Sequence, residues 1–399
     1  MSFMNSIHPV PRGRARHYAG RALGVLLLGL VASCQGASQD AMSVEPPQAA
    51  QARRAALSKP RAQETFGSGP VRVGLITALL ASAGESQRER DIRDGAVLAV
   101  DELGSGQLSL QIENTDGSSE QIQEAAKRLS DQGVRLVAVS ADVRTTVARE
   151  GVRAKDVPIL VLGSTSSQPG EGGFSFISDR IDSAVEGASY AAASGRKRFI
   201  LLAPADMTAA ERHRLDRGLA GYGIKPVLTA GAASVPGDAS ARAKLKDIDA
   251  VVSIGAGEAE VGSLSALRAN GHLAANAIVV GSSQWTPASY RLPELARSHL
   301  CLFGPENGSR MTASFRQRYE RAANLDAAYG FDIVALAAGL VRTQGESGIN
   351  RQALLSPNGF LGAAAAFRFE KDGSVRRTCA IYQLVDGTLS LADPAPRSF

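Results

Sequence analysis

The sequence predicts an α/β fold with two parallel sheets, one in each of two lobes. From Val71 onward, short runs of aliphatic and β-branched residues alternate with longer segments whose apolar residues recur at helical spacing. Parallel strands need long connections, and helices between the strands supply them, so the alternation favours parallel sheets with right-handed crossovers. The pattern occurs in two series, before and after about residue 180, which indicates two sheets.

Length and composition agree with two lobes of ordinary size. The chain has 399 residues, and a domain commonly holds ~100–200. A hydrophobic content of 44% and a charged content of 21% are typical of a globular protein. The net charge is +5, but residues 1–33 contain four arginines and no acid, which leaves +1 for the rest of the chain. This small charge gives no indication of nucleic-acid binding.

The N-terminus has the pattern of a secretory signal peptide, which we place at residues 1–33. A cationic region ending at Arg21 leads into an apolar run, Ala22–Ala32, that is too short to span a bilayer. The sequence Val31-Ala32-Ser33-Cys34 resembles a bacterial lipoprotein signal, in which the Cys is lipidated. Cys34 is therefore the expected lipid anchor, and Gln35 after it favours the outer membrane in that pattern. The alternative is an ordinary signal peptide.

Residues 34–70 show no periodicity and are rich in Gln, Ala, Ser and Pro, so we expect a flexible tether. The first series of strands and helices begins after it. Its expected strands are 71–76, 108–114, 134–139 and 157–162, and its expected helices are 92–103, a segment with Ile122, Ala125, Ala126 and Leu129 on one face, and 144–154.

The second series repeats this alternation and is followed by a different ending. Its expected strands are 198–203, 226–230, 250–254 and 277–280, and its helices are 181–193, 208–222 and 261–270. A crossover strand is expected at 299–303, followed by helices at 314–323 and 331–343. Residues 364–369 and 376–385 flank Asp372-Gly373, a strong hairpin signal.

These elements, in this order, resemble type I periplasmic binding proteins of the leucine-binding family. The resemblance depends on the lipoprotein-type signal, the first strand Val71–Ile76, the first helix with Gly95–Val100, Thr115-Asp116 after the second strand, and the closing Phe367-Arg368-Phe369 hairpin. It implies two Rossmann-like lobes joined by three crossovers, with a ligand held between them in the periplasm. The implied lobes are 71–180 plus 303–345 and 181–302 plus 346–391, with an irregular tail at 392–399.

The resemblance also implies ligand-binding residues at the carboxyl ends of strands. Hydroxyl and backbone N–H groups that would receive a carboxylate correspond to Thr77, Ser140, Ala141, Ser164 and Thr165. The simpler interpretation is that these Ser and Thr residues cap the next helices, at ~1 kcal/mol each.

In the second lobe, Asp206 and Glu258 would meet an ammonium group, and Trp285 would cover the ligand. The alternatives are solvated carboxylates near helix starts and a core tryptophan.

Two functions follow, because the loops depart from the family pattern. Ala78–Ala81 and Ser140–Asp142 stand where transport-type members have Gly-Pro, and the second lobe lacks the usual Tyr-Gly after its first strand. The first function is capture of a small polar ligand such as an amino acid for the permease of an ABC importer. The second is that of an outer-membrane lipoprotein that activates a peptidoglycan synthase.

No sequence pattern indicates an enzyme, a cofactor or a metal. The chain has neither Gly-x-Ser-x-Gly nor His-Glu-x-x-His. His213, His272 and His299 have no companions at ligand spacing, and the glycines at Gly255, Gly257 and Gly262 are wrongly spaced for a dinucleotide fingerprint.

Two cysteines, Cys301 and Cys379, remain after Cys34. In an oxidising compartment they could form a disulfide. Because both lie within strand-like runs, the sequence favours two separate buried thiols.

Overall fold

The computed structural model describes residues 60–81, 86–104, 106–140, 145–152, 156–162, 173–231, 245–305 and 308–399. All of these belong to one compact unit. The predicted signal peptide, Cys34 and most of the predicted tether lie outside the described residues. Within the described residues, no helix has both the length and the apolar character needed to cross a membrane.

The first sheet has six strands in the order β1-β3-β2-β4-β5-β6, and every pairing except that of β1 is parallel. Helices α2 (Gln87–Leu103) and α10 (Leu325–Gln344) cover one face, while α3 (Ser119–Asp131) and α4 (Thr145–Gly151) cover the other. This confirms the predicted first series of strands and helices. The strands are β1 Gln63–Phe66, β2 Val71–Thr77, β3 Leu108–Asn114, β4 Leu136–Val139, β5 Ile159–Val161 and β6 Gly173–Ser175.

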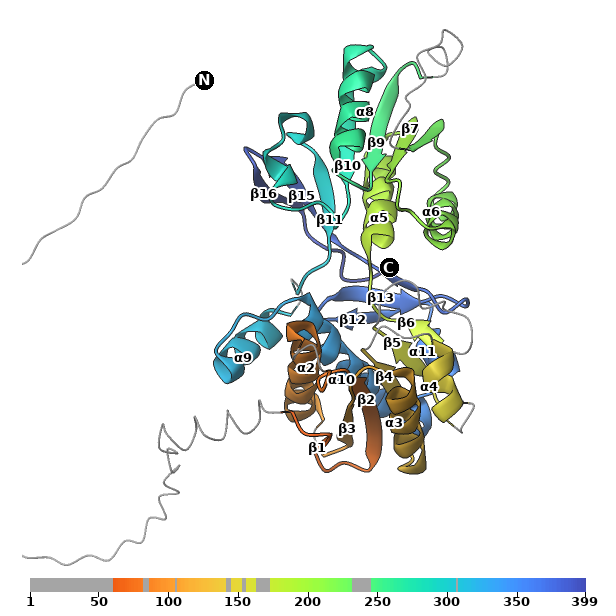
Figure 1. The fold of residues 1–399 in the computed structure, drawn as a ribbon, viewed down its shortest axis with the longest axis vertical. Helices are drawn as coiled ribbons and strands as arrows, with labels where there is room; N and C mark the ends of the chain where they lie inside the picture. Colours follow the sequence, from red (N-terminus) through yellow and green to blue (C-terminus); the bar gives the residue numbers. More distant parts are fainter. Residues whose placement is uncertain are drawn as a thin grey trace, which may run out of the picture. The chain divides into compact units, whose positions relative to one another are not determined.

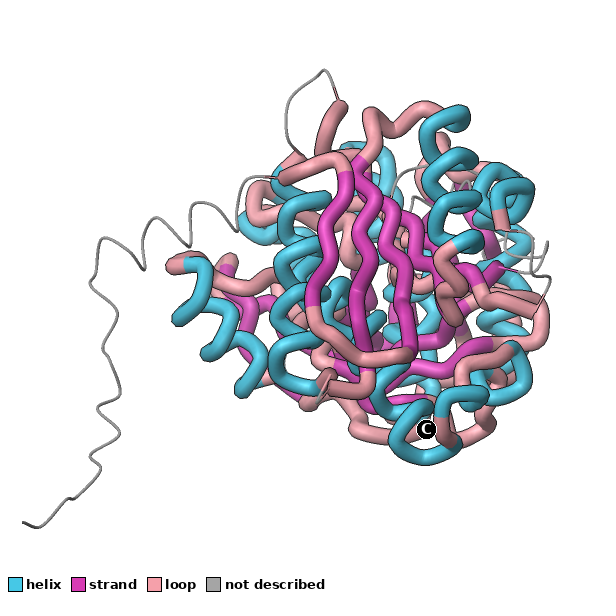
Figure 2. The backbone as a smooth tube through the Cα atoms, turned by 90° about the horizontal axis from the view of Figure 1, so that it is seen from below, coloured by secondary structure: helices cyan, strands magenta, loops and turns pink. Residues whose placement is uncertain are grey.

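The second sheet has seven strands in the order β16-β15-β11-β10-β9-β7-β8. Helices α5 (Arg180–Ala193) and α6 (Ala209–Gly221) pack on one face, and α8 (Glu258–Ala269) packs on the other (Figure 1). Figure 2 shows neighbouring strands with helices on both sides of them. The strands from β7 to β11 are parallel, and β15 and β16 are antiparallel to their neighbours. They are β7 Phe199–Ala203, β8 Leu228–Gly231, β9 Ile248–Ser253, β10 Leu273–Gly281, β11 His299–Leu302, β15 Ala380–Val385 and β16 Thr388–Asp393.

The structure has a third sheet, made of three short strands, and it changes the division of the chain that we predicted from the sequence. It consists of β12 (Phe360–Gly362), β13 (Ala365–Phe369) and β14 (Val375–Arg377), and the predicted turn lies at Gly373, whose φ is +85°. The predicted second strand of the hairpin, 376–385, is divided in the structure: β14 pairs with β13, and 380–385 form β15 of the second sheet. We expected 346–391 to join the second lobe. Instead Ile349, Leu354 and alternate residues of the hairpin pack in the core of the first sheet, and only β15 and β16 join the second sheet.

The irregular segment before the first sheet ends earlier than predicted, because it is followed by strand β1. Residues 63–66 pair antiparallel with β3, although 34–70 was expected to be irregular. The segment looks polar, but its acid Glu64 forms an ion pair with the buried Arg93 of α2, and Phe66 packs partly against the first core. The residue that pairs with Glu64 is 29 positions away, so the tether's composition could not reveal it.

Helices α2 and α10 pack in close contact at two glycines. A Cβ on Gly95 would lie 1.9 Å from the carbonyl oxygen of Ala327, and a Cβ on Gly330 would lie 1.9 Å from that of Ile92. Each helix therefore presents a glycine to the backbone of the other, and no larger residue fits at either position without movement.

Three segments connect the two sheets, as the fold class predicts. Crossing one runs from β6 to α5 over residues 176–179. Crossing two leaves β11 for α9 (Ser309–Tyr319), whose Met311 and Phe315 belong to the first core. Crossing three joins β14 to β15 through Thr378 and Cys379.

Cys301 and Cys379 form a disulfide, so the expectation of two separate thiols was wrong. Cys301 lies in β11, opposite Ile381 of the neighbouring strand β15, and Cys379 immediately precedes β15. Strand pairing brings the cysteines together although 78 positions separate them in the sequence.

Candidate functional site

The carboxyl edge of the first sheet holds Thr77 and Ser140, at the ends of the neighbouring strands β2 and β4. Both side chains are completely buried. The Thr77 hydroxyl donates to Oδ1 of Asn114 at 2.5 Å, and the Ser140 hydroxyl donates to the carboxylate of Glu89. Both hydroxyl groups thus donate hydrogen bonds to other side chains of the protein. In neither of these hydrogen bonds does the side chain cap the helix that follows.

Three further predicted residues of this edge, Ala141, Ser164 and Thr165, lie outside the described residues.

An arginine and a glutamate in the first turn of α2 connect three strand ends, and neither was predicted from the sequence. Arg88 donates from Nη1 to the carbonyl oxygen of Ser140 at 2.9 Å and from Nη2 to the carbonyl oxygen of Leu162, which follow β4 and β5. Glu89 accepts from the N–H of Ala78 at 3.1 Å and pairs with Arg88 at 2.8 Å. A charged pair directly after the first loop, where an amphipathic helix begins, is the signal that would have indicated them.

Asp326, near the start of α10, completes this charged group. Its Oδ1 lies 3.6 Å from Nε of Arg88, and 30% of its side chain is exposed, compared with 35% for Arg88. Burial raises the pKa of Asp326, while Arg88 opposes the shift. The first edge therefore presents a partly exposed guanidinium and a partly exposed carboxylate.

The carboxyl edge of the second sheet is organised by Arg180, the first residue of α5. Asp206 follows β7, is exposed, and lies 3.2 Å from Nη1 of Arg180. The same Arg180 nitrogen donates to Oε1 of Gln284, in the loop after β10, at 3.0 Å, and Nε lies 2.9 Å from Glu211 of α6. The structure thus brings the predicted Asp206 together with Arg180 and Gln284, which no local sequence signal indicated.

The other two predicted residues of the second lobe differ in exposure. Glu258 is exposed in the first turn of α8, where the helix dipole favours a carboxylate. Trp285 is only 4% exposed, and its Nε1 donates to the carbonyl oxygens of Ser253 and Gly255 at 3.1 and 3.0 Å. Its ring packs so closely on Gly281 that a Cβ there would lie 2.5 Å away. Trp285 is a core residue, which was the alternative to covering a ligand.

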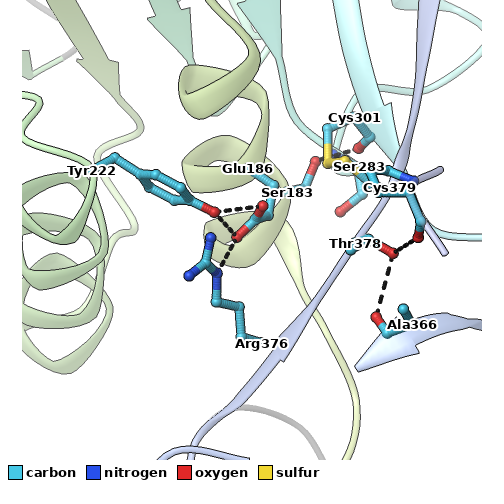
Figure 3. The surroundings of a disulfide bond; sticks show 10 residues. Ser183, Glu186, Tyr222, Ser283, Cys301, Ala366, Arg376, Thr378 and Cys379 are labelled. Atoms are coloured by element: carbon cyan, nitrogen blue, oxygen red, sulfur yellow. Dashed lines mark hydrogen bonds and ion pairs between the residues drawn. A yellow bond between two sulfur atoms is a disulfide. The ribbon is translucent and has the colours of Figure 1, made fainter. Parts of the chain in front are cut away.

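A cavity of about 390 Å³ lies between α5, α6 and the β13–β14 hairpin, and none of the predicted site residues lines it. Four of its five arginines are paired with carboxylates as follows: Arg214 with Asp179 and Asp182, Arg217 with Asp372, Arg368 with Glu370, and Arg376 with Glu186. Tyr222 donates to Glu186 at 2.7 Å (Figure 3). Two of these pairs, Arg217 with Asp372 and Arg376 with Glu186, connect helices of the second sheet to the hairpin, so ion pairs form part of the cavity wall. No group of His, Cys, Asp and Glu among the described residues could hold a metal ion.

Comparison with known proteins agrees with this architecture. A family model described as periplasmic binding protein matches residues 70–388. A Rhodospirillum rubrum protein assigned to branched-chain amino acid ABC transporters has 18% identity over 80% of this chain and 99% of its own, with a TM-score of 0.62. An ABC transporter substrate-binding protein of Desulfitobacterium hafniense also has 18% identity, over 80% of this chain and 99% of its own, with a TM-score of 0.52, and its structure in complex with Leu gives 0.50.

No curated protein sequence matches the chain. At 18% identity the structural likeness shows the fold alone, whereas the family model covers most of the chain. Together with two mainly parallel sheets joined by three crossings, this match shows that the chain belongs to the type I periplasmic binding proteins of the leucine-binding family.

Proposed function

We propose that the protein is an extracytoplasmic solute-binding lipoprotein that captures a small polar ligand, an amino acid by class, for an ABC importer. Family membership supports binding of a solute. We infer the class of ligand from one observation: each sheet edge holds a guanidinium next to a carboxylate. The pairs are Arg88 with Asp326, and Arg180 with Asp206. An amino acid carries both charges, so groups of both signs can meet its carboxylate and its ammonium.

The exposed fractions of these side chains support the same proposal. Arg88 and Asp326 are about one third exposed, and Asp206 is 68% exposed, so each can exchange part of its present contact for a ligand. Arg180 is more enclosed, at 18%, and would mainly position Asp206 and Gln284.

Thermal-shift screening against amino acids, followed by calorimetry, tests this proposal. A ligand at about 100 times its Kd should stabilise the folded protein by about 2.7 kcal/mol and so raise the melting temperature. Arg88→Gln and Arg180→Gln should weaken the binding of that ligand. Arg268→Gln, at an exposed position in the last turn of α8, is the matched control and should leave binding unchanged. No saturable response to any amino acid would overturn the proposal.

The lipid anchor is a separate part of the proposal. We infer from Val31-Ala32-Ser33-Cys34 that Cys34 is lipidated and holds the protein in the outer membrane, facing the periplasm. Full-length protein should then partition into a detergent phase, and Cys34→Ser should return it to the aqueous phase. Equal partitioning of both forms would contradict the anchor.

A second function, activation of a peptidoglycan synthase by direct contact, is favoured by one observation. The hydroxyls of Thr77 and Ser140 are bonded to Asn114 and Glu89, so they are not available to a ligand carboxylate in this arrangement. If this function holds, amino acids should give no thermal shift, and a purified synthase should bind the protein and gain activity. Solute binding without any effect on a synthase would exclude it.

A further inference from the structure

The connections between the two sheets are fastened to one another by three consecutive residues, Arg377, Thr378 and Cys379. Thr378 and Cys379 form crossing three, Arg377 is the last residue of β14 before it, and the three residues are called the clasp below. Arg377 ends β14, in the sheet packed on the first core, and Cys379 immediately precedes β15 of the second sheet. The clasp therefore lies where the chain passes from one lobe to the other.

Cys379 is bonded covalently to the strand from which crossing two starts. Its disulfide partner, Cys301, lies in β11 one residue before the strand ends and crossing two begins. Cys301 is completely buried and Cys379 is 6% exposed. The carbonyl oxygen of Cys301 also accepts from the hydroxyl of Ser183 in α5 at 2.6 Å (Figure 3). The covalent bond thus holds the second-sheet ends of crossing two and crossing three together.

Arg377 is hydrogen-bonded to crossing one. Its side chain is completely buried, and Nη2 donates to the carbonyl oxygen of Phe176 at 2.9 Å. The guanidinium lies 4.7 to 5.4 Å from the ring centres of Phe176, Tyr329 and Phe367. The carboxylate of Asp332 is 3.7 Å from Nη1. A buried cation held by one carboxylate, one carbonyl and three rings cannot move away without losing these contacts together.

Thr378 fixes the clasp to the third sheet and to the C-terminal tail. Its N–H donates to the carbonyl oxygen of Ala366 in β13 at 2.9 Å, and its hydroxyl donates to the carbonyl oxygen of Pro396 at 2.8 Å. Figure 3 shows Thr378 beside the disulfide and Ala366. Each of the three clasp residues therefore holds a different segment of the chain.

We propose that the clasp restrains the bending of the hinge between the two lobes. Lobes of this kind move by changes of backbone angles in a few connecting residues, and those changes need the connections to shift independently. Here the disulfide joins crossings two and three, and Arg377 joins crossings one and three. Relative motion of the lobes is therefore limited to movements that all three connections make together.

The test is a distance measurement between spin labels, one on each lobe. The parent protein carries Cys34→Ser, Lys127→Cys on α3 and Asp216→Cys on α6, both at exposed positions, while the native disulfide stays closed and unlabelled. We expect a narrow distance distribution in this parent. Cys301→Ser/Cys379→Ser should broaden and shift the distribution, and Arg377→Lys, which keeps the charge but loses the fork-shaped guanidinium, should do the same.

Trp285→Phe is the control for destabilisation alone, because Trp285 lies in the second core and not in a crossing. It should leave the distribution narrow. Unchanged distributions in both clasp variants would overturn the proposal, as would equal broadening in the control. The disulfide variant keeps the test decisive if Arg377→Lys fails to fold.

Discussion

At the scale of single residues, Asp182 is a carboxylate in the cavity wall that lies beside both an arginine and a second aspartate. It lies at the start of α5, where its Oδ2 accepts from the N–H of Asp179 at 3.0 Å and its Oδ1 accepts from Arg214 at 3.0 Å. Burial raises the pKa of Asp182 to about 7, and the nearby charge of Asp179 adds to the shift while Arg214 opposes it. Asp182 therefore takes up its proton near neutral pH.

This pKa predicts a pH-dependent stability. Between about pH 4 and pH 7 the folded protein binds a proton at Asp182 that the unfolded chain has lost, so this group's contribution to stability falls as pH rises. Relative to Asp182→Asn, the wild type should lose up to about 1.4 kcal/mol per pH unit over this interval. Urea unfolding at several pH values measures the difference.

The control for this pH series is Asp216→Asn, because that carboxylate is exposed on the neighbouring helix α6. A difference between wild type and Asp182→Asn that stays constant from pH 4 to pH 8 would contradict the shifted pKa.

Residue types at strand ends were predictable, but their contacts were not. The sequence placed Thr77 and Ser140 at the ends of β2 and β4, where they lie. The direction of each hydroxyl depends on a partner elsewhere in the chain, Asn114 or Glu89, which local pattern cannot reveal. Arg180 was missed for the same reason, since its partners come from the loops after β7 and β10 and from α6.

At the scale of elements, the packing of α2 on α10 depends on Gly95 and Gly330. Both glycines are helical, where glycine is intrinsically unfavourable compared with alanine, so their presence needs a reason. The reason is the 1.9 Å separation that a Cβ would have from the opposite backbone.

We predict that Gly95→Ala and Gly330→Ala each destabilise the protein by about 1–3 kcal/mol or more, because the helices must move apart. Gly339→Ala is a matched control on α10, since a Cβ there would meet no heavy atom within 4 Å. It should be neutral or stabilise the protein by up to about 1 kcal/mol. Denaturant unfolding compares the three variants, and equal effects at all three positions would refute this explanation of the packing.

Strands and helices with strong periodicity were predictable, whereas elements formed mainly by tertiary contacts were not. The first-sheet strands β2 to β5 were found from their apolar runs and polar ends. β1 has only four residues and depends on β3 and Arg93 for its place. The β13–β14 turn was predictable from Asp372-Gly373, but the pattern could not show which core its apolar side chains enter.

At the scale of the whole molecule, the disulfide between Cys301 and Cys379 closes a long loop of the chain. This loop starts in β11 of the second sheet, contains α9, α10 and the third sheet, and ends just before β15. Cross-linking residues 78 positions apart removes many conformations from the unfolded chain. The disulfide therefore raises the free energy of unfolding, in addition to its effect on the hinge.

Cys301→Ala/Cys379→Ala should lower the free energy of unfolding by roughly 4–5 kcal/mol in the chain-entropy model. Urea unfolding of the oxidised wild type and the variant measures the change. Wild type unfolded in the presence of a reductant should match the variant, because the same bond is absent in both. An unchanged unfolding midpoint would mean that the bond adds nothing to stability.

The position of β1 has a practical consequence for how the protein is handled. Gln63 pairs with Glu113 near the carboxyl end of β3, and the N–H of Asn114 donates to the carbonyl oxygen of Ala62, so the chain enters the first sheet at the edge that carries Arg88. A purification tag or sensor-chip linker fused shortly before Pro60 would be joined to the chain at the same edge of the sheet as the residues assigned to solute capture. Immobilisation through an exposed lysine on α3 would leave that edge unobstructed.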